Sequence, residues 1–269
     1  LEMVSLDPGW FSSTGHFRLK AEGAVFGEQF KDSELLFVDR IEHGPLPVSR
    51  LVTLKWWPVL ATSHLALEKN PTTEKWFAAT KDVSPVKGVA NIGFNRSVTG
   101  NLELLPLEYK DGTTSVTFSG LNMDYFNTEK ATEIKVDGYM DALKVSLVDP
   151  KGAPFQAELN GLTLASNLTK SSFGFYVGQN TVVLSNSTFT FGPEQAVLTV
   201  KGFEQKDSSD TKDNNLDGRV DYKITEIGYQ GKPVGSAAMA VSVKNIDVPS
   251  TMVLTKLYQD KMQPVQAAA

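Results

Sequence analysis

Hydrophobic and polar residues alternate one by one through the long middle part of the chain, from residue 86 to 245. In the stretch "TEIKVDGYM", for example, Ile134, Val136 and Met140 are separated by charged or small residues. Successive side chains of a β-strand point to opposite faces, so this period of two is typical of strands with one buried face. The pattern predicts a series of half-buried antiparallel strands.

The alternation changes its parity in the stretch that follows. In "DALKVSLVD" the apolar positions are Leu143, Val145 and Leu147, which are odd where the preceding ones are even. An extra residue or a local distortion in a strand produces such a change. We therefore expect a bulge or a sharp bend near Asp141.

Turn sequences at short intervals connect these segments. The Asp-Gly pair in "KDGT" at 110–113 favours a tight hairpin, and "VGQNT" and "YQGKP" follow the same logic. We count about twelve candidate strands, a number that must twist, curl or split into layers. The predicted fold class is mainly β (α+β), a long curved antiparallel β-meander with two or three short helices. It forms a single elongated domain over residues 1–269.

The first predicted helix follows the sequence "HGPLP". Pro47 suits a first helical turn, and Val48, Leu51, Val52 and Trp56 recur at helical spacing until Pro58.

Two further helices are predicted beyond this one. In "TTEKWFAATKD", Thr72 or Thr73 is the expected cap, with Trp76 and Phe77 facing inward. Near the end of the chain, Ser250 is the expected N-cap of a helix with an apolar stripe. That stripe consists of Val253, Leu254, Leu257 and Tyr258.

Composition and charge describe an ordinary folded protein. The chain is 41% hydrophobic and 21% charged, with a net charge of -5 and scattered Lys and Arg residues, so nucleic acid is not an expected partner. The absence of cysteine excludes disulfides, thiolate metal sites and a cysteine nucleophile. No sequence motif indicates a cofactor, and no run of about 18 apolar residues predicts a transmembrane helix.

The stretch "DNNLDGRVDYKI" at 213–224 partly matches a calcium-binding loop. Its candidate ligands are Asp213, Asn215, Asp217 and Asp221. The last ligand of such a loop should be a bidentate Glu, but Ile224 stands there, and the alternation after Gly218 predicts a strand where the motif needs a helix. A polar hairpin tip is the alternative interpretation.

The chain has three histidines, His16, His43 and His64, and these limit the catalytic schemes. A hydrolase would need a nucleophile within hydrogen-bond reach of His43 or His64 in a cleft. No Gly-x-Ser-x-Gly sequence is present. The alternative role for His43 is a structural hydrogen bond that fixes the Gly-Pro turn beside it.

Trp56 and Trp57 are adjacent and large. Neighbours on a helix point about 100° apart, so one sheet has difficulty burying both. They either pack together at a seam between helix and sheet or form, with His43, a surface for a ligand or partner.

The sequence "IEHGPLPVSRL" at 41–51, with "GWFSS" at 9–13 and the later hairpins, resembles the YdgA-like family of bacterial envelope proteins. The His-Gly-Pro of residues 43–45 is its most specific element. The resemblance implies a periplasmic protein tethered to the inner membrane by an N-terminal anchor, of which this chain is the N-terminal half of the soluble region. The family has no established activity, so the resemblance implies no catalytic residues.

These observations favour a non-catalytic periplasmic module that acts as a scaffold or binding surface. Its expected partners are an apolar or lipid-like ligand, another envelope protein, or a second copy in a homo-oligomer. The alternatives are a hydrolase with a histidine base and a calcium-stabilised β-module.

Overall fold

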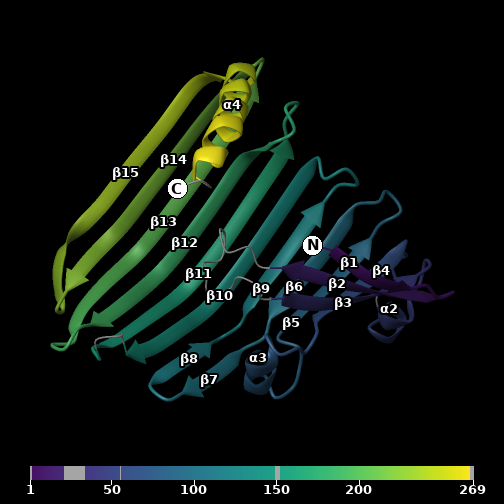
Figure 1. Cartoon of the computed structure of the whole chain (residues 1–269), viewed down its shortest axis with the longest axis horizontal. Helices are drawn as coiled ribbons and strands as arrows, with labels where there is room; N and C mark the ends of the chain where they lie inside the picture. Colours follow the sequence, from purple (N-terminus) through teal and green to yellow (C-terminus); the bar gives the residue numbers. More distant parts are fainter. Residues whose placement is uncertain (1, 21–33, 55, 149–151, 267–269) are drawn as a thin grey trace.

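One large antiparallel sheet dominates the protein (Figure 1). The computed structural model describes residues 2–20, 34–54, 56–148 and 152–266, with side chains up to residue 258. Within these ranges fifteen strands belong to the sheet. The prediction of a mainly β fold with few helices is confirmed.

The strands of the first half are short. Their bounds are β1 (Glu2–Asp7), β2 (Ser12–Lys20), β3 (Glu34–His43), β4 (Ala61–Leu67), β5 (Val86–Ile92), β6 (Val98–Leu104), β7 (Leu107–Asp111), β8 (Thr114–Phe118) and β9 (Leu121–Asn127). Each strand from β1 to β6 pairs with the next, and β6 then pairs with β9. The hairpin of β7 and β8 leaves this path and pairs through β8 with the second half of β10.

The strands of the second half are long, with 15 to 17 residues each. Their bounds are β10 (Glu133–Val148), β11 (Pro154–Lys170), β12 (Tyr176–Phe191), β13 (Ala196–Lys212), β14 (Asn215–Tyr229) and β15 (Lys232–Asp247). They follow one another in sheet order as they do in sequence, so this half is a regular meander.

The parity change near Asp141 is a bend shared by several strands rather than a bulge in one of them. The pairing of β10 with β11 keeps the same register on both sides, from Met140 opposite Leu162 to Ala142 opposite Asn160. The pairings of β11 with β12, β12 with β13 and β13 with β14 also skip one pair of residues at the same height in the sheet. The residues along this line are Asp141, Gly161, Ser185, Gly202 and Thr225.

Apolar rows lie on both sides of this line. The row before it consists of Met140, Leu162, Leu184, Phe203 and Ile224, each opposite the next. The row after it consists of Leu143, Leu159, Val200 and Ile227, with the buried Ser187 between Leu159 and Val200. Each of the five strands from β10 to β14 has one extra residue on this line. The apolar side chains after the bend therefore point to the same face as those before it, and the pairing register does not change.

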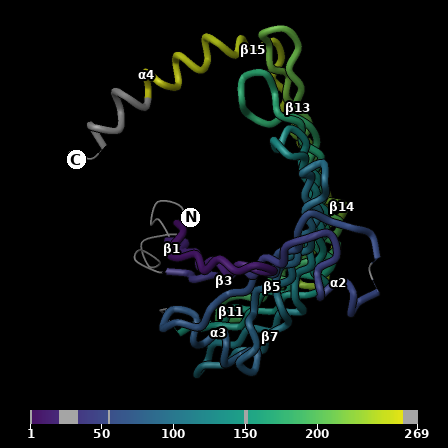
Figure 2. The backbone as a smooth tube through the Cα atoms, turned by 90° about the vertical axis from the view of Figure 1, so that its right-hand side faces the viewer, coloured from purple at the N-terminus to yellow at the C-terminus, as the bar shows by residue number. Residues whose placement is uncertain are grey.

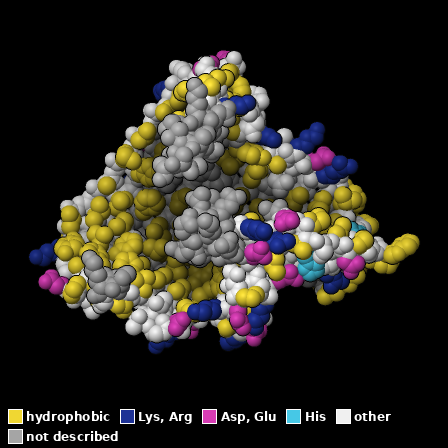
Figure 3. Space-filling model, viewed as in Figure 1, with side chains coloured by type: hydrophobic (Ala, Val, Ile, Leu, Met, Phe, Trp, Pro, Cys, Tyr) yellow, Lys and Arg dark blue, Asp and Glu magenta, His cyan; other side chains and the backbone are white. Residues whose placement is uncertain are grey.

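The sheet is curved like a letter C (Figure 2). Its hollow side is the one seen in Figures 1 and 3, and hydrophobic side chains gather there over the long strands (Figure 3). The open end of the C is flanked by α4 (Val248–Gln266), which projects away from the end of β15. We call the hollow side of the sheet the concave face.

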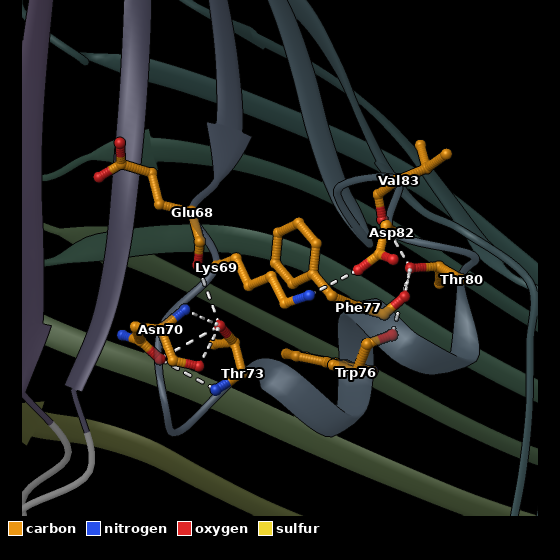
Figure 4. Close-up of polar contacts among 9 residues, drawn as sticks. All are labelled: Glu68, Lys69, Asn70, Thr73, Trp76, Phe77, Thr80, Asp82 and Val83. Atoms are coloured by element: carbon orange, nitrogen blue, oxygen red, sulfur yellow. Dashed lines mark hydrogen bonds and ion pairs between the residues drawn. The ribbon is translucent and has the colours of Figure 1, made fainter.

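A compact core exists at one end of the sheet. Leu67, Phe77 and Val86 are buried there, and Phe77 comes from α3 (Glu74–Ala79). The helix is held by polar contacts at both ends (Figure 4). At its start Thr73 Oγ1 donates to the Glu68 carbonyl at 3.0 Å, and at its end Thr80 Oγ1 donates to the Val83 carbonyl at 2.5 Å.

The sequence placed α3 correctly but not all of its details. Thr73 precedes the helix as expected, although its hydroxyl makes no cap bond to a helical N–H group. Phe77 faces inward as predicted, whereas Trp76 is 37% exposed. Neighbouring residues on a helix point about 100° apart, so Trp76 does not share the inward side with Phe77.

The other two helices also differ from their predicted bounds. The helix α2 (Val48–Val52) begins after Pro47 as predicted but ends before Trp56. The helix α4 forms where it was predicted, but it begins at Val248, so Ser250 lies inside its first turn. Asp247 Oδ1 accepts the Ser250 N–H at 2.8 Å and therefore caps the helix in its place.

Candidate functional site

The His-Gly-Pro sequence builds the turn that leads from β3 into α2. Gly44 has a φ of 100°, a conformation that a glycine adopts without strain. Its N–H donates to the Leu60 carbonyl at 3.2 Å, and the Pro45 carbonyl accepts the Val59 N–H at 3.1 Å. The turn thereby brings α2 beside the ends of β3 and β4.

A carboxylate, a hydroxyl and an imidazole meet at this turn. Glu42 Oε2 accepts the Ser49 hydroxyl at 2.6 Å and the Ser49 N–H at 3.2 Å. His64 Nε2 lies 3.3 Å from the same hydroxyl. Burial raises the pKa of Glu42, but the Ser49 hydrogen bonds and the positive fields of His64 and Arg40 outweigh it and bring the pKa below its ordinary value.

A buried arginine fixes the other side of α2. Arg50 is 9% exposed and donates from Nη1 to Asn91 Oδ1 and from Nη2 to the Trp57 carbonyl, both at 2.8 Å. Asn91 Oδ1 also accepts the Thr62 hydroxyl at 3.1 Å. The guanidinium thus joins the helix, the segment that follows it and two strands of the sheet.

The other two histidines also have polar partners. His43 Nε2 lies 2.8 Å from the Ser13 hydroxyl, which comes from β2. His16 Nδ1 lies 3.1 Å from Glu68 Oε1, an ion pair when the imidazole is protonated. Both His43 and His64 therefore have a serine within hydrogen-bond reach.

The geometry at Ser49 suits helix capping better than nucleophile activation. In a catalytic triad the serine hydroxyl donates to the imidazole, and the carboxylate contacts the far nitrogen of that ring. Here the hydroxyl donates to Glu42, which also holds the Ser49 N–H at the start of α2. The groove described below is lined by other residues.

Trp56 and Trp57 lie in the irregular segment after α2, so the argument from helical spacing does not apply to them. Trp56 is 64% exposed and Trp57 is 84% exposed, so the interpretation that both pack at a seam between helix and sheet is wrong. The Trp57 backbone is held by Arg50 while its ring stays in solvent.

The four candidate calcium ligands lie on and beside a tight hairpin. Asp213, with a φ of 55°, and Asn214 connect β13 to β14, and Asn215 pairs with Lys212. Asp217 Oδ1 accepts the Asn245 N–H at 2.7 Å, and Asp221 is held by Arg219, whose Nε donates to Oδ2 at 2.6 Å. No cluster of three or more metal-binding His, Asp or Glu side chains occurs among the described residues.

The concave face ends in an apolar groove beneath α4. The cavity has a volume of about 670 Å³, and Lys256 is the one charged residue among its described lining residues. The other lining residues are Phe175, Leu216, Ile246, Val248, Thr251, Met252, Val253 and Thr255. Sequence reasoning identified the apolar stripe of α4 but not this groove, because three separate segments meet there only in the folded chain.

Together these features define a mainly β protein built on one open sheet, with an apolar concave face and a polar cluster at the start of α2. None of the described helices has the length and apolar character needed to cross a membrane. The whole chain, residues 1–269, matches the family described as bacterial protein of unknown function (DUF945), and it belongs to that family.

Curated relatives of the chain are found in two bacteria. It is 24% identical to Protein YdgA of Escherichia coli over 236 residues, which cover 87% of this chain and 47% of that protein. It is 22% identical to the uncharacterized protein YihF of the same organism, over 100% of this chain and 55% of that one.

A shorter match, 39% identical over 62 residues, is to an uncharacterized protein of Haemophilus influenzae. It covers 23% of this chain and 16% of that protein. The chain spans about half the length of the two Escherichia coli relatives. No solved structure matches it.

Proposed function

We propose that this chain is a non-catalytic module of the bacterial envelope whose concave face binds an anionic amphiphile with a long apolar chain. The periplasmic location and the tether to the inner membrane belong to this proposal, and they rest on the resemblance of the residues around His43. The observation that carries the binding function is the apolar concave face, on which most hydrophobic side chains of the long strands keep intermediate exposure.

The exposed surface of the protein supports this proposal. The accessible area is 17676 Å², whereas a compact monomer of the same mass would expose roughly 11,500 Å². Few hydrophobic side chains are buried, and most of those on the long strands keep intermediate exposure. Burial of apolar area is favourable by about 25 cal/mol per Å². A ligand that covers the rows beside the bend therefore gains affinity without a large rearrangement of the protein.

The groove beneath α4 gives the ligand its expected chemistry. Its volume lies within the range of about 300–1,000 Å³ that is usual for small-molecule sites. The described lining is mostly apolar and carries one ammonium group, which matches a long hydrocarbon chain that ends in a carboxylate or phosphate. Lys256 would contact the anionic group, while Met252 and Ile246 would contact the chain.

The polar cluster at α2 supports a structural role rather than catalysis. Its groups satisfy one another: Glu42 caps the helix, Ser49 bonds to Glu42, and Arg50 holds the segment that follows. A hydrolytic nucleophile would need its hydroxyl directed at a base beside a substrate cavity.

A fluorescent fatty acid titrated into the purified protein tests the proposed binding. Leu184 and Val183 are neighbours on β12, and because strand side chains alternate, they face opposite sides of the sheet. Leu184→Gln on the apolar row should weaken binding about tenfold, a loss of about 1.4 kcal/mol that is comparable to burying part of a leucine. Val183→Gln is the matched control and should leave the affinity unchanged. Equal affinities for both variants, or no binding by the wild type, would refute the proposal.

A further inference from the structure

The last strand, β15, is a long and open edge of the sheet. It forms the outer border of the molecule in Figure 1, and its described pairing is with β14 only. All of its 16 residues are exposed except Ile246, which is half-buried. The backbone groups that point away from β14 therefore have no strand partner within the described residues.

The middle of β15 lacks the features that usually protect an edge. Its three charged residues, Lys232, Lys244 and Asp247, lie at or near the two ends, and the run from 233 to 243 is uncharged. Natural proteins keep edge strands short or place charges along them, because a long uncharged edge is a template for another strand. The opposite edge, β1, has these protections, since it has six residues with an acidic residue at each end.

The central part of β15 is also geometrically regular. From Ala237 to Val243 its pairing with β14 runs without a shift, whereas irregularities lie on both sides of this segment. The register places Met239 opposite Tyr222 and Val241 opposite Val220, so these two side chains share the apolar face of β14. Ala238, Ala240 and Ser242 lie on the other face.

We propose that β15 pairs antiparallel with β15 of a second copy of this chain, along residues 237–243 and about a two-fold axis at Ala240. Two copies related by an axis perpendicular to the sheet keep the same face on the same side. Residue 239 then lies opposite residue 241 of the second copy, and Ala240 lies opposite its own counterpart. Apolar side chains meet apolar ones on the concave face, and small ones meet on the other face, which is what favourable cross-strand pairs require.

Charge complementarity at the ends supports a second copy as the occupant. Antiparallel pairing brings the Lys232 end of one strand beside the Asp247 end of the other. Lys244 lies opposite Ser236 of the second copy, so no like charges face each other. The seven residues span about 23 Å of backbone. The helix α4 leans over the sheet rather than beyond β15, so the outer side of the strand is open (Figure 1).

Sedimentation of the 269-residue chain over a range of concentrations tests this inference. The wild type should show a concentration-dependent dimer. Ala240→Lys places two ammonium groups opposite each other at the axis, and Ala240→Glu places two carboxylates there, so each variant should be a monomer. An equimolar mixture of the two folded variants should form the dimer again, because Lys then faces Glu.

A second pair of mixtures tests which residues of the two β15 strands lie opposite each other. A mixture of Ala238→Lys and Ser242→Glu should associate more tightly than either variant alone, because residues 238 and 242 are opposite each other in the proposed dimer. A mixture of Ala238→Lys with Ala238→Glu should gain no such affinity, because each introduced charge then faces Ser242. A wild type that stays monomeric at all concentrations overturns the inference. So does a dimer that Ala240→Lys does not weaken, or a mixture of the Ala240 variants that does not associate. Circular dichroism of each variant separates loss of pairing from loss of folding.

Discussion

The Ser185 hydroxyl donates to the Gly161 carbonyl at 3.2 Å across the bend of the sheet. Gly161 has a φ of 68°, and a Cβ atom added to it would lie 2.6 Å from Ser185 Oγ. The same relationship recurs two strands away, between Gly202 and Thr225. The bend therefore depends on glycine in alternate strands and on a hydroxyl residue in the strands between them.

Substitution of Gly161 should destabilise the protein for two separable reasons. Gly161→Ala introduces left-handed strain of about 1–2 kcal/mol, and the contact with Ser185 adds overpacking of about 1–3 kcal/mol. Gly192→Ala is the control, because its φ is 76° but no atom lies within 4 Å of the added Cβ. Urea unfolding should give a larger loss for Gly161→Ala. Equal losses would show that the contact across the bend contributes nothing.

The contact between Glu42 and Ser49 should make stability depend on pH. The folded pKa of Glu42 lies below its ordinary value of 4.5, so its contribution is complete above that pH and is lost as the pH falls through the folded pKa. Glu42→Gln should lower stability near neutral pH by about 1 kcal/mol, as loss of a helix cap does. Melting curves of both proteins should converge below pH 4.5. A difference that persists at low pH would contradict this assignment.

Arg50 should contribute more to stability than an exposed arginine. Arg50→Met leaves the Trp57 carbonyl without its donor and leaves Asn91 Oδ1 with the Thr62 hydroxyl alone, which should cost about 1–3 kcal/mol. Arg96, which pairs with Glu129 on the surface, is the control, and Arg96→Met should change stability by less than about 0.5 kcal/mol. Chemical denaturation measures both. Similar effects of the two substitutions would argue against a structural role for the buried guanidinium.

Calcium should leave the melting temperature of the protein unchanged. Asp217 already accepts a backbone N–H, and Asp221 is occupied by Arg219. Asp217→Ala should lower the melting temperature because Asn245 loses its acceptor, and the decrease should be equal with and without millimolar calcium. A wild-type protein stabilised by calcium, with no such effect in Asp217→Ala, would instead indicate a cation site, since a ligand of the native state must stabilise it.

The serines beside the histidines should have no catalytic role. Ser49→Ala removes the hydroxyl that donates to Glu42 and should reduce stability by about 1 kcal/mol. Hydrolysis of a chromogenic ester should be the same for the wild type, Ser49→Ala and Ser13→Ala. A selective loss of turnover in either variant, with its fold intact, would support the hydrolase alternative.

Local patterns predicted the elements more successfully than they predicted the contacts. The alternation around Val136 and Val145 identified β10, and the change of parity between them located the bend. That the bend is common to five strands could not be predicted, because the level of Asp141 relative to Gly161 and Ser185 depends on the pairing register. The exposure of Trp57 could not be predicted either, since its backbone is held by Arg50 of α2, which also bonds to Asn91 of β5.

The sequence by itself determined that the chain is an antiparallel β-meander and where its few helices lie. The alternation of apolar and polar side chains and the turn residues that carry this information are local properties of the chain. Only the tertiary structure decided that the described sheet is a single curved layer, that Ser49 meets both Glu42 and His64, and that β15 pairs with no strand other than β14 among the described residues. These features depend on which residues distant in sequence become neighbours, and a local pattern carries no information about that choice.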